Sequence, residues 1–100
     1  MTKTGFVYIM SAPDKTALYT GVTSDLVGRV WQHRNKYYPK SFTSKYNCVV
    51  LVYYENCGSI EAAINEEKRI KAGSRQQKLN LINHMNPEWK DLWNEINDVA

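Results

Sequence analysis

The apolar residues of this chain fall into short β-prone runs, separated by polar segments and by stretches with helical spacing. Residues 6–10 are continuously apolar, which is typical of a strand buried on both faces. A turn-forming segment with Pro13 and Asp14 follows, and residues 17–22 form a second run, so the pattern predicts a β-hairpin. Residues 48–54 make the clearest strand, which we expect at the centre of the sheet.

Capping residues and helical stripes predict the helices. Thr23 or Ser24 is expected to cap a first helix that reaches about Lys36, and residues 40–47 are expected to form a loop. Ser59 predicts a second helix, which ends at a glycine after residue 72.

A third helix is expected to begin near Ser74, and a last helix to begin at Pro87. The last helix would carry an apolar stripe made of Trp89, Leu92, Trp93 and Ile96. The order ββαβαα(α) predicts an α+β fold, in which a small three-stranded antiparallel or mixed sheet is flanked by helices.

The length and composition limit the class of protein. A chain of 100 residues with 43% hydrophobic content has room for one folded domain, which we expect to span residues 1–100. No apolar run approaches the roughly 20 residues that cross a bilayer, and the N-terminal run is too short for a signal peptide. We therefore expect a cytoplasmic chain without membrane contact.

Charge is segregated along the chain more than the net charge of +3 suggests. Residues 26–54 and 68–87 contain no Asp or Glu but several Lys and Arg. Acidic residues gather near the end, at Glu88, Asp91, Glu95 and Asp98. This favours a basic surface for a polyanion such as nucleic acid, although two ordinary solvated faces explain the charges equally well.

Several polar residues lie on faces that should be apolar. Glu67 falls on the same helical stripe as Ile60 and Ile64, where a carboxylate is costly unless it is paired or bound to a cation. Taken alone, a structural ion pair is the simpler explanation and a metal ligand the functional one. Arg29 and His33 stand one turn apart on the face of the first helix that should meet the sheet.

The hairpin contributes two phenols, because Tyr8 and Tyr19 become neighbours if both face the same side. Gly21 in the second strand allows another group to approach the backbone closely. Together, two phenols, an arginine, a histidine and a carboxylate are the groups that phosphodiester hydrolysis requires. From the residues alone this activity is plausible and no more.

Four segments resemble a known family. The motifs Phe6-Val7-Tyr8 and Tyr19-Thr20-Gly21 are similar to the paired motifs that name the GIY-YIG nuclease superfamily. The segment SDLVGRVWQH resembles the superfamily's arginine-bearing helix, and AAINEEKRIKAGSR resembles its glutamate-bearing helix. The likeness covers nearly the whole chain and is greatest to small stand-alone bacterial members, which are related to the N-terminal domain of an excision-repair nuclease.

The resemblance implies an endonuclease that cleaves DNA with one divalent metal, either Mg²⁺ or Mn²⁺. Glu67 would bind the metal, Arg29 would stabilise the phosphate, and His33 would help to organise the water. We assign Tyr8 as general base, supported by Tyr19, although the two roles are interchangeable at this point. Departures at Phe6, Thr20 and Gly73 remove no catalytic atom.

The resemblance also shapes what we expect of substrate and partners. No separate specificity domain is present in the sequence, so low sequence specificity is expected, with a role in DNA repair or recombination. The chain is assumed to be a monomer. We expect DNA to contact Gly21, Lys36, Lys40, Lys45, Tyr46, Arg75 and Lys78. The alternatives are a non-catalytic nucleic-acid-binding module on the same scaffold, or an adaptor that docks a partner through the last helix.

Overall fold

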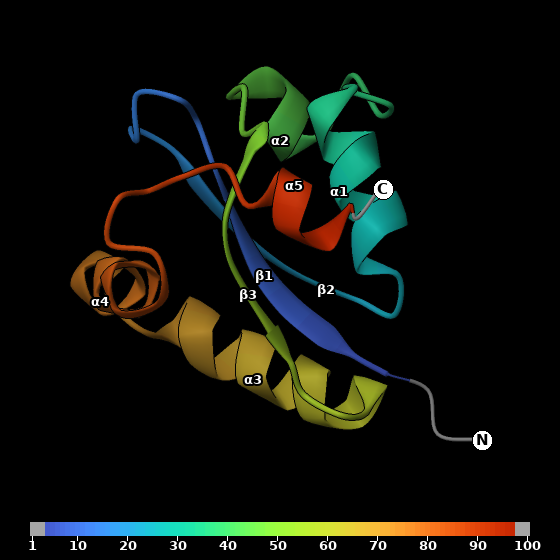
Figure 1. Cartoon of the computed structure of the whole chain (residues 1–100), viewed down its shortest axis with the longest axis vertical. Coiled ribbons are helices and arrows are strands. Elements are labelled where there is room, and N and C mark those ends of the chain that lie inside the picture. Colours follow the sequence, from blue (N-terminus) through green and yellow to red (C-terminus); the bar gives the residue numbers. More distant parts are fainter. Residues whose placement is uncertain (1–3, 98–100) are drawn as a thin grey trace.

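A three-stranded antiparallel sheet forms the centre of the computed structural model, which describes residues 4–97 (Figure 1). Strand β1 (Phe6–Ser11) lies between β2 (Leu18–Thr23) and β3 (Val50–Asn56). The hairpin is therefore confirmed, whereas the expectation that the third strand occupies the centre is wrong. The middle position belongs to β1, which pairs on both sides, and this explains why its residues from Val7 onward are all buried.

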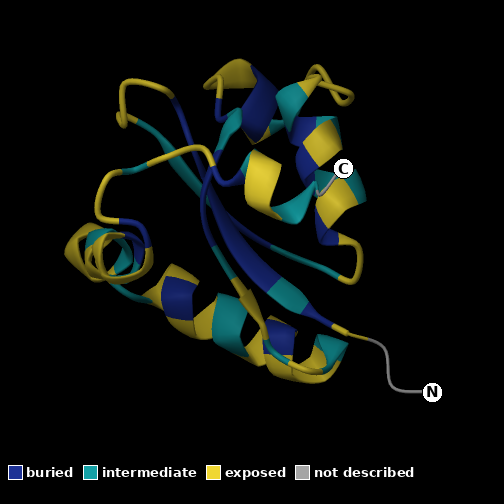
Figure 2. Ribbon diagram, viewed as in Figure 1, coloured by how far each residue is buried: buried dark blue, intermediate teal, exposed yellow. Residues whose placement is uncertain are grey.

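Helices cover both faces of the sheet (Figure 1). Helix α1 (Leu26–Arg34), helix α5 (Trp93–Ile96) and the residues of β1 at even positions, such as Tyr8 and Met10, share one core cluster. Helices α3 (Ile60–Ala72) and α4 (Arg75–Met85) pack with Val7 and Ile9 on the opposite face. Figure 2 shows buried residues along the central strand, with exposed residues on the outer sides of the helices. The predicted α+β fold with helices flanking an antiparallel sheet is confirmed.

Two of the four predicted helix starts agree with the structure. Ser59 and Ser74 cap α3 and α4 by accepting hydrogen bonds from backbone N–H groups, as expected. The cap of α1 is Asp25 rather than Thr23 or Ser24, because the Asp25 carboxylate accepts from the backbone N–H of Gly28 at 3.1 Å.

The segment expected to be a loop between α1 and β3 contains a short helix, α2 (Phe42–Lys45). Ser41 caps it by accepting from the Ser44 backbone N–H at 3.3 Å, and the helix buries Thr43 and Ser44. The element order is thus ββααβααα, with one helix more than the predicted order. This helix was not predicted because the segment is polar and the two residues that the helix buries both carry hydroxyl groups.

The long last helix expected from Pro87 does not form. Helix α5 covers only Trp93–Ile96, and Trp89 adopts a left-handed backbone conformation with φ of 54°. The preceding segment is held against β3 instead, since the Asn86 side chain donates to the Val52 carbonyl at 3.2 Å. The backbone N–H of Leu92 donates to the Leu51 carbonyl at 2.8 Å. These tertiary hydrogen bonds override the helical spacing of the apolar residues.

Two further expectations concern membrane contact and the ends of the chain. Among residues 4–97, no helix has both the length and the apolar character needed to cross a membrane. Asp98, one of the acidic residues noted near the end of the chain, lies outside the described residues, as do residues 1–3 and 99–100 of the expected single domain.

Candidate active site

The two hairpin tyrosines face the same side of the sheet. Tyr8 lies opposite Gly21 and Tyr19 lies opposite Met10, so the phenols are diagonal neighbours across β1 and β2. Their ring centroids are 6.3 Å apart. Tyr8 is fully buried and Tyr19 is half-buried, which places Tyr19 nearer to the solvent.

Gly21 makes room for the Tyr8 side chain. A Cβ atom at this position would lie 2.5 Å from the Tyr8 Cζ and 2.9 Å from the Tyr19 Cε2. The close approach that the sequence predicted at Gly21 is therefore made by the protein's own phenol ring. Any larger residue would have to displace a fully buried tyrosine, so Gly21 fixes where the Tyr8 hydroxyl lies.

His33 of α1 joins the tyrosines on this face. Its Nε2 is 2.8 Å from the Tyr8 hydroxyl, and its Nδ1 is 2.8 Å from the Thr43 Oγ1. The imidazole is buried, with its centroid 5.4 Å from that of Tyr19. Burial, together with the nearby positive charge of Arg29, lowers the His33 pKa to about 4. The imidazole is consequently neutral at pH 7.

The Tyr8 phenol is held in its neutral form. Burial raises its pKa above the ordinary value, and the neighbouring Tyr19 adds to the effect. The positive charge of Arg29 acts in the opposite direction without cancelling it. Because Tyr8 resists ionisation, it can take a proton from another group only if its own proton moves onward. The hydrogen bond between its hydroxyl and His33 provides that onward path.

Arg29 brings the positive charge to this group. Its guanidinium is half-buried and donates from Nη1 to the Gln32 Oε1 at 2.9 Å. The guanidinium carbon also lies 5.8 Å from the ring centroid of Tyr38. Neither contact is an ion pair, and Arg29 therefore keeps a charge that an anion can neutralise.

Glu67 approaches from the other side of the sheet, on α3. Its carboxylate is largely buried, with its side chain 16% exposed, and it forms an ion pair with Lys71, whose Nζ lies 3.2 Å from Oε2. The Lys71 Nζ lies 6.0 Å from the Tyr19 ring centroid, which places this ion pair beside the tyrosines. Glu67 also contributes to the raised Tyr8 pKa. The predicted neighbour on the apolar stripe, Ile64, is exposed.

The side chains around Glu67 suit a divalent metal that binds together with a substrate. Among residues 4–97, no three His, Cys, Asp or Glu side chains come together as a group able to enclose an ion. Glu67 nevertheless holds its carboxylate against one cation, the Lys71 ammonium. Mg²⁺ commonly uses one or two carboxylates and completes its shell with water and substrate phosphate. A divalent cation at Glu67 would therefore have one protein carboxylate as ligand and would take its other ligands from water and substrate.

Four of the predicted DNA-contacting residues lie on the surface around α1 and α2. Lys36, Lys40 and Lys45 are exposed, and Tyr46 is exposed with its ring centroid 4.6 Å from that of Phe42. Phe42 in turn stacks on Tyr19 at 6.1 Å. A row of aromatic rings thus runs from exposed Tyr46 through Phe42 to half-buried Tyr19, and the exposed lysines belong to the same acid-free segment.

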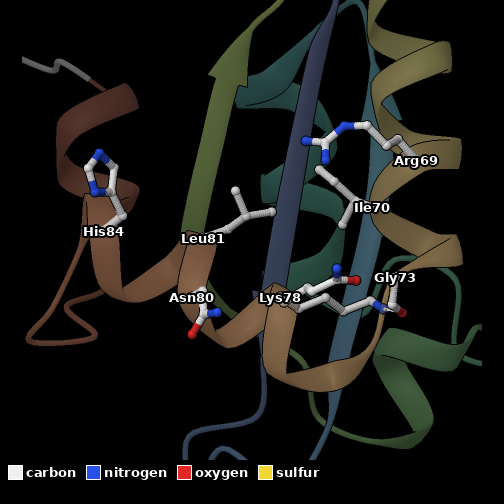
Figure 3. A pocket seen from close by; sticks show the side chains of 8 residues that line it. Arg69, Ile70, Gly73, Lys78, Asn80, Leu81 and His84 are labelled. Atoms are coloured by element: carbon white, nitrogen blue, oxygen red, sulfur yellow. Dashed lines mark hydrogen bonds between the residues drawn. The ribbon is translucent and has the colours of Figure 1, made fainter.

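Two further predicted DNA-contacting residues, Arg75 and Lys78, have backbone partners. Arg75 donates to the Lys15 carbonyl at 2.7 Å, and Lys78 donates from Nζ to the Gly73 carbonyl at 2.9 Å. Lys78 also lines a cavity of about 270 Å³ between α3 and α4 (Figure 3). That cavity is lined by Arg69, Ile70, Gly73, Gln77, Lys78, Asn80, Leu81 and His84. None of these is among the predicted catalytic residues.

Two residues of the site were missed by sequence reasoning. Lys71 stands four positions after Glu67, a spacing that predicts a helical ion pair and could have been read from the sequence. Thr43 bonds the second nitrogen of His33 from a segment that was expected to be a loop. No local signal identified Thr43, because its role depends on α2 packing against α1.

Known proteins share this sequence pattern over most of the chain. The model of the family described as the GIY-YIG catalytic domain matches residues 4–80. A UPF0213 protein from Syntrophus aciditrophicus is 39% identical over 83 residues, which cover 83% of this chain and 93% of the relative. UPF0213 protein SH2523 from Staphylococcus haemolyticus is 40% identical over 77 residues, covering 77% of this chain and 92% of the relative.

A solved structure gives the same result for the fold. The solution NMR structure of UPF0213 protein BH0048 from Bacillus halodurans superposes with a TM-score of 0.56 at 25% sequence identity. The match covers 91% of this chain and 95% of that one. This structure is thus similar in fold over 91% of the chain.

Proposed function

This chain belongs to the GIY-YIG catalytic-domain family, a nuclease superfamily, and from that premise we propose that it is a metal-dependent endonuclease. Its substrate is DNA, cut with little sequence preference, and residues 1–100 act as one nuclease domain. A nick of this kind suits DNA repair or recombination. The hydrogen bond between Tyr8 and neutral His33, next to the positive charge of Arg29, is the observation that carries the proposal.

Tyr8 and His33 handle the proton of the attacking water. The water transfers its proton to the Tyr8 oxygen while the Tyr8 proton passes to the His33 Nε2, 2.8 Å away. The water oxygen bonds to phosphorus, and the bond from phosphorus to the leaving sugar oxygen breaks. The sugar oxygen keeps the bonding electron pair and takes a proton from solvent. This route avoids a free tyrosinate, which the burial of Tyr8 disfavours.

Arg29 and Glu67 handle charge. Arg29 donates hydrogen bonds to the phosphate. Once the phosphate neutralises the positive charge of Arg29, that charge lowers the His33 pKa less, and His33 accepts a proton more easily. Glu67 would hold Mg²⁺ or Mn²⁺ together with the substrate, and a cation bound there would supply positive charge to the phosphate and the leaving oxygen. Tyr19 lies between the α1 side of the site, with Tyr8 and His33, and the α3 side, with Glu67. It helps to hold the phosphate in place. The basic surface with Lys36, Lys40, Lys45 and Tyr46 holds the strand.

A plasmid-nicking assay tests the metal residue. Wild type should nick in Mg²⁺ or Mn²⁺ but not in EDTA, and Glu67→Gln should lose nicking by at least about 10²-fold. Glu66→Gln is the matched control, because Glu66 is the preceding carboxylate and pairs with Arg69. Equal activity in Glu67→Gln and wild type would refute the metal assignment.

The same assay tests the proton residue. Tyr8→Phe keeps the ring but removes the hydroxyl, so cleavage should fall by about 10²–10⁴-fold. Tyr53→Phe is its control, since Tyr53 lies in β3 within the core of the other sheet face. A wild type that binds DNA without cutting any substrate would favour the non-catalytic binding module.

A further inference from the structure

A chain of hydroxyl groups runs away from His33 behind the site. The Thr43 Oγ1 that contacts the His33 Nδ1 lies 3.2 Å from the Ser41 Oγ. The Ser41 Oγ lies 3.2 Å from the Ser44 Oγ, and the Ser44 hydroxyl lies 2.7 Å from the Tyr38 carbonyl oxygen. His33, Thr43 and Ser44 are buried, so the chain connects a ring nitrogen to a fixed backbone acceptor.

The carbonyl at the end of the chain fixes the direction of every bond in it. A carbonyl oxygen only accepts, so Ser44 must give its single proton to Tyr38. Ser41 must then donate to Ser44, because the Ser44 proton is already used. By the same count, Thr43 donates to Ser41 and has no proton left for His33.

This count determines which nitrogen of His33 carries the proton. The contact between His33 and Thr43 is a hydrogen bond only if the Nδ1 carries hydrogen and donates to the Thr43 oxygen. A neutral imidazole has one ring proton, so Nε2 is left as an acceptor. The Tyr8 hydroxyl therefore donates to Nε2, at 2.8 Å.

We propose that Thr43, backed by Ser41 and Ser44, is a positioning residue that holds His33 in the tautomer with its proton on Nδ1. In this tautomer Nε2 is free to receive the Tyr8 proton. In the opposite tautomer Nε2–H points at the phenol oxygen, and the transfer is blocked. The catalytic consequence rests on the proposed nuclease function, whereas the tautomer itself does not.

Helix α2 is the element that makes the arrangement possible. Ser41 caps it, and the four-residue turn places Thr43 toward α1 and Ser44 toward Tyr38. The three hydroxyls occur within four consecutive residues, so a single turn supplies the whole chain. With Thr43 2% exposed and His33 5% exposed, water does not compete readily for these hydrogen bonds.

Proton-detected ¹⁵N NMR of the histidine rings tests the tautomer directly. The chain has two histidines, and His84 on the exposed side of α4 serves as an internal reference. Wild type at pH 7 should show His33 as the Nδ1–H form. A majority of the Nε2–H form in wild type would overturn the proposal without any need for a variant.

Two substitutions extend the test. Thr43→Val keeps the shape but removes the hydroxyl, and should shift His33 toward Nε2–H and lower kcat by about 10²-fold with little change in KM. Thr43→Ser should restore both the tautomer and kcat. An unchanged His33 pattern in Thr43→Val would refute the role of Thr43. Wild type that shows the Nδ1–H form but cuts no DNA would refute the nuclease function alone.

Discussion

The two sides of the site differ in how firmly the fold holds them. On the α1 and α2 side, Tyr8 and His33 are buried and each hydrogen bond is completed by another protein group. On the α3 side, Glu67 is held by Lys71, a side chain that is 52% exposed. The groups proposed to move protons are thus built into the core, whereas the carboxylate proposed to receive a cation has a partner that can leave.

This difference suits the roles proposed for the two sides. Proton transfer depends on distances within a few tenths of an ångström, so rigid packing favours it. A cation shared with the substrate has to arrive and depart, and a fixed protein cage would hinder that exchange. Three measurements of stability test this contrast.

The largest effect is expected from Gly21→Ala. The added Cβ would collide with the Tyr8 ring, which is fully buried and whose hydroxyl contacts His33, and overpacking of this kind costs up to about 3 kcal/mol. Urea unfolding followed by circular dichroism measures the loss in the free energy of unfolding. A variant as stable as wild type, with the Tyr8 resonances unmoved, would show that the buried side is looser than described.

The pH dependence of stability gives an effect of intermediate size. The His33 pKa is about 4 in the folded chain, below the ordinary value near 6.5, so the unfolded chain binds more protons between these values. The stabilisation that buried, neutral His33 contributes to the folded chain is therefore fully retained above pH 6.5 and is lost as the pH falls toward 4. At pH 4.5 the loss should reach about 2 kcal/mol.

A His33→Gln variant isolates this contribution from that of the carboxylates. Urea unfolding of both proteins at pH 7.0, 5.5 and 4.5 should show a weaker pH dependence in the variant. If the free energy of unfolding depends on pH equally in wild type and variant, His33 titrates normally and is not buried in its neutral form.

The smallest effect is expected from Lys71→Gln. An ion pair with an exposed lysine at this helical spacing contributes only a few tenths of a kcal/mol, so the free energy of unfolding should change by less than about 0.5 kcal/mol. Lys68→Gln, an exposed lysine on the same helix, is the control. A loss of several kcal/mol in Lys71→Gln alone would show that the Glu67 side is held as firmly as the side with Tyr8 and His33.

Much of the fold could be predicted from local pattern. The hairpin register that brings Tyr8 and Tyr19 together follows from the period of two in paired strands. The caps Ser59 and Ser74 follow from the chemistry of orphan backbone N–H groups. The residues that form the candidate site were likewise visible as polar groups on apolar faces, and Glu67, Arg29 and His33 are at least half-buried in the structure.

What could not be predicted depends on contacts between distant segments. The apolar spacing after Pro87 is helical, yet Asn86 and Leu92 bond to β3 and hold the backbone in an irregular course. The central strand was misassigned because apolar content does not reveal how many neighbours a strand has. Thr43 acquires its partner only when α2 lies against α1, and no periodicity in residues 40–47 encodes that contact.

The course of the chain after α4 has a consequence for self-association. The outward-facing backbone groups of Leu51 in β3 are both occupied, the N–H by the Asp91 carboxylate and the C=O by the Leu92 N–H. A strand from another molecule would need those same groups to add itself to the sheet. At Leu51, the irregular segment that replaces the expected helix therefore blocks edge-to-edge aggregation.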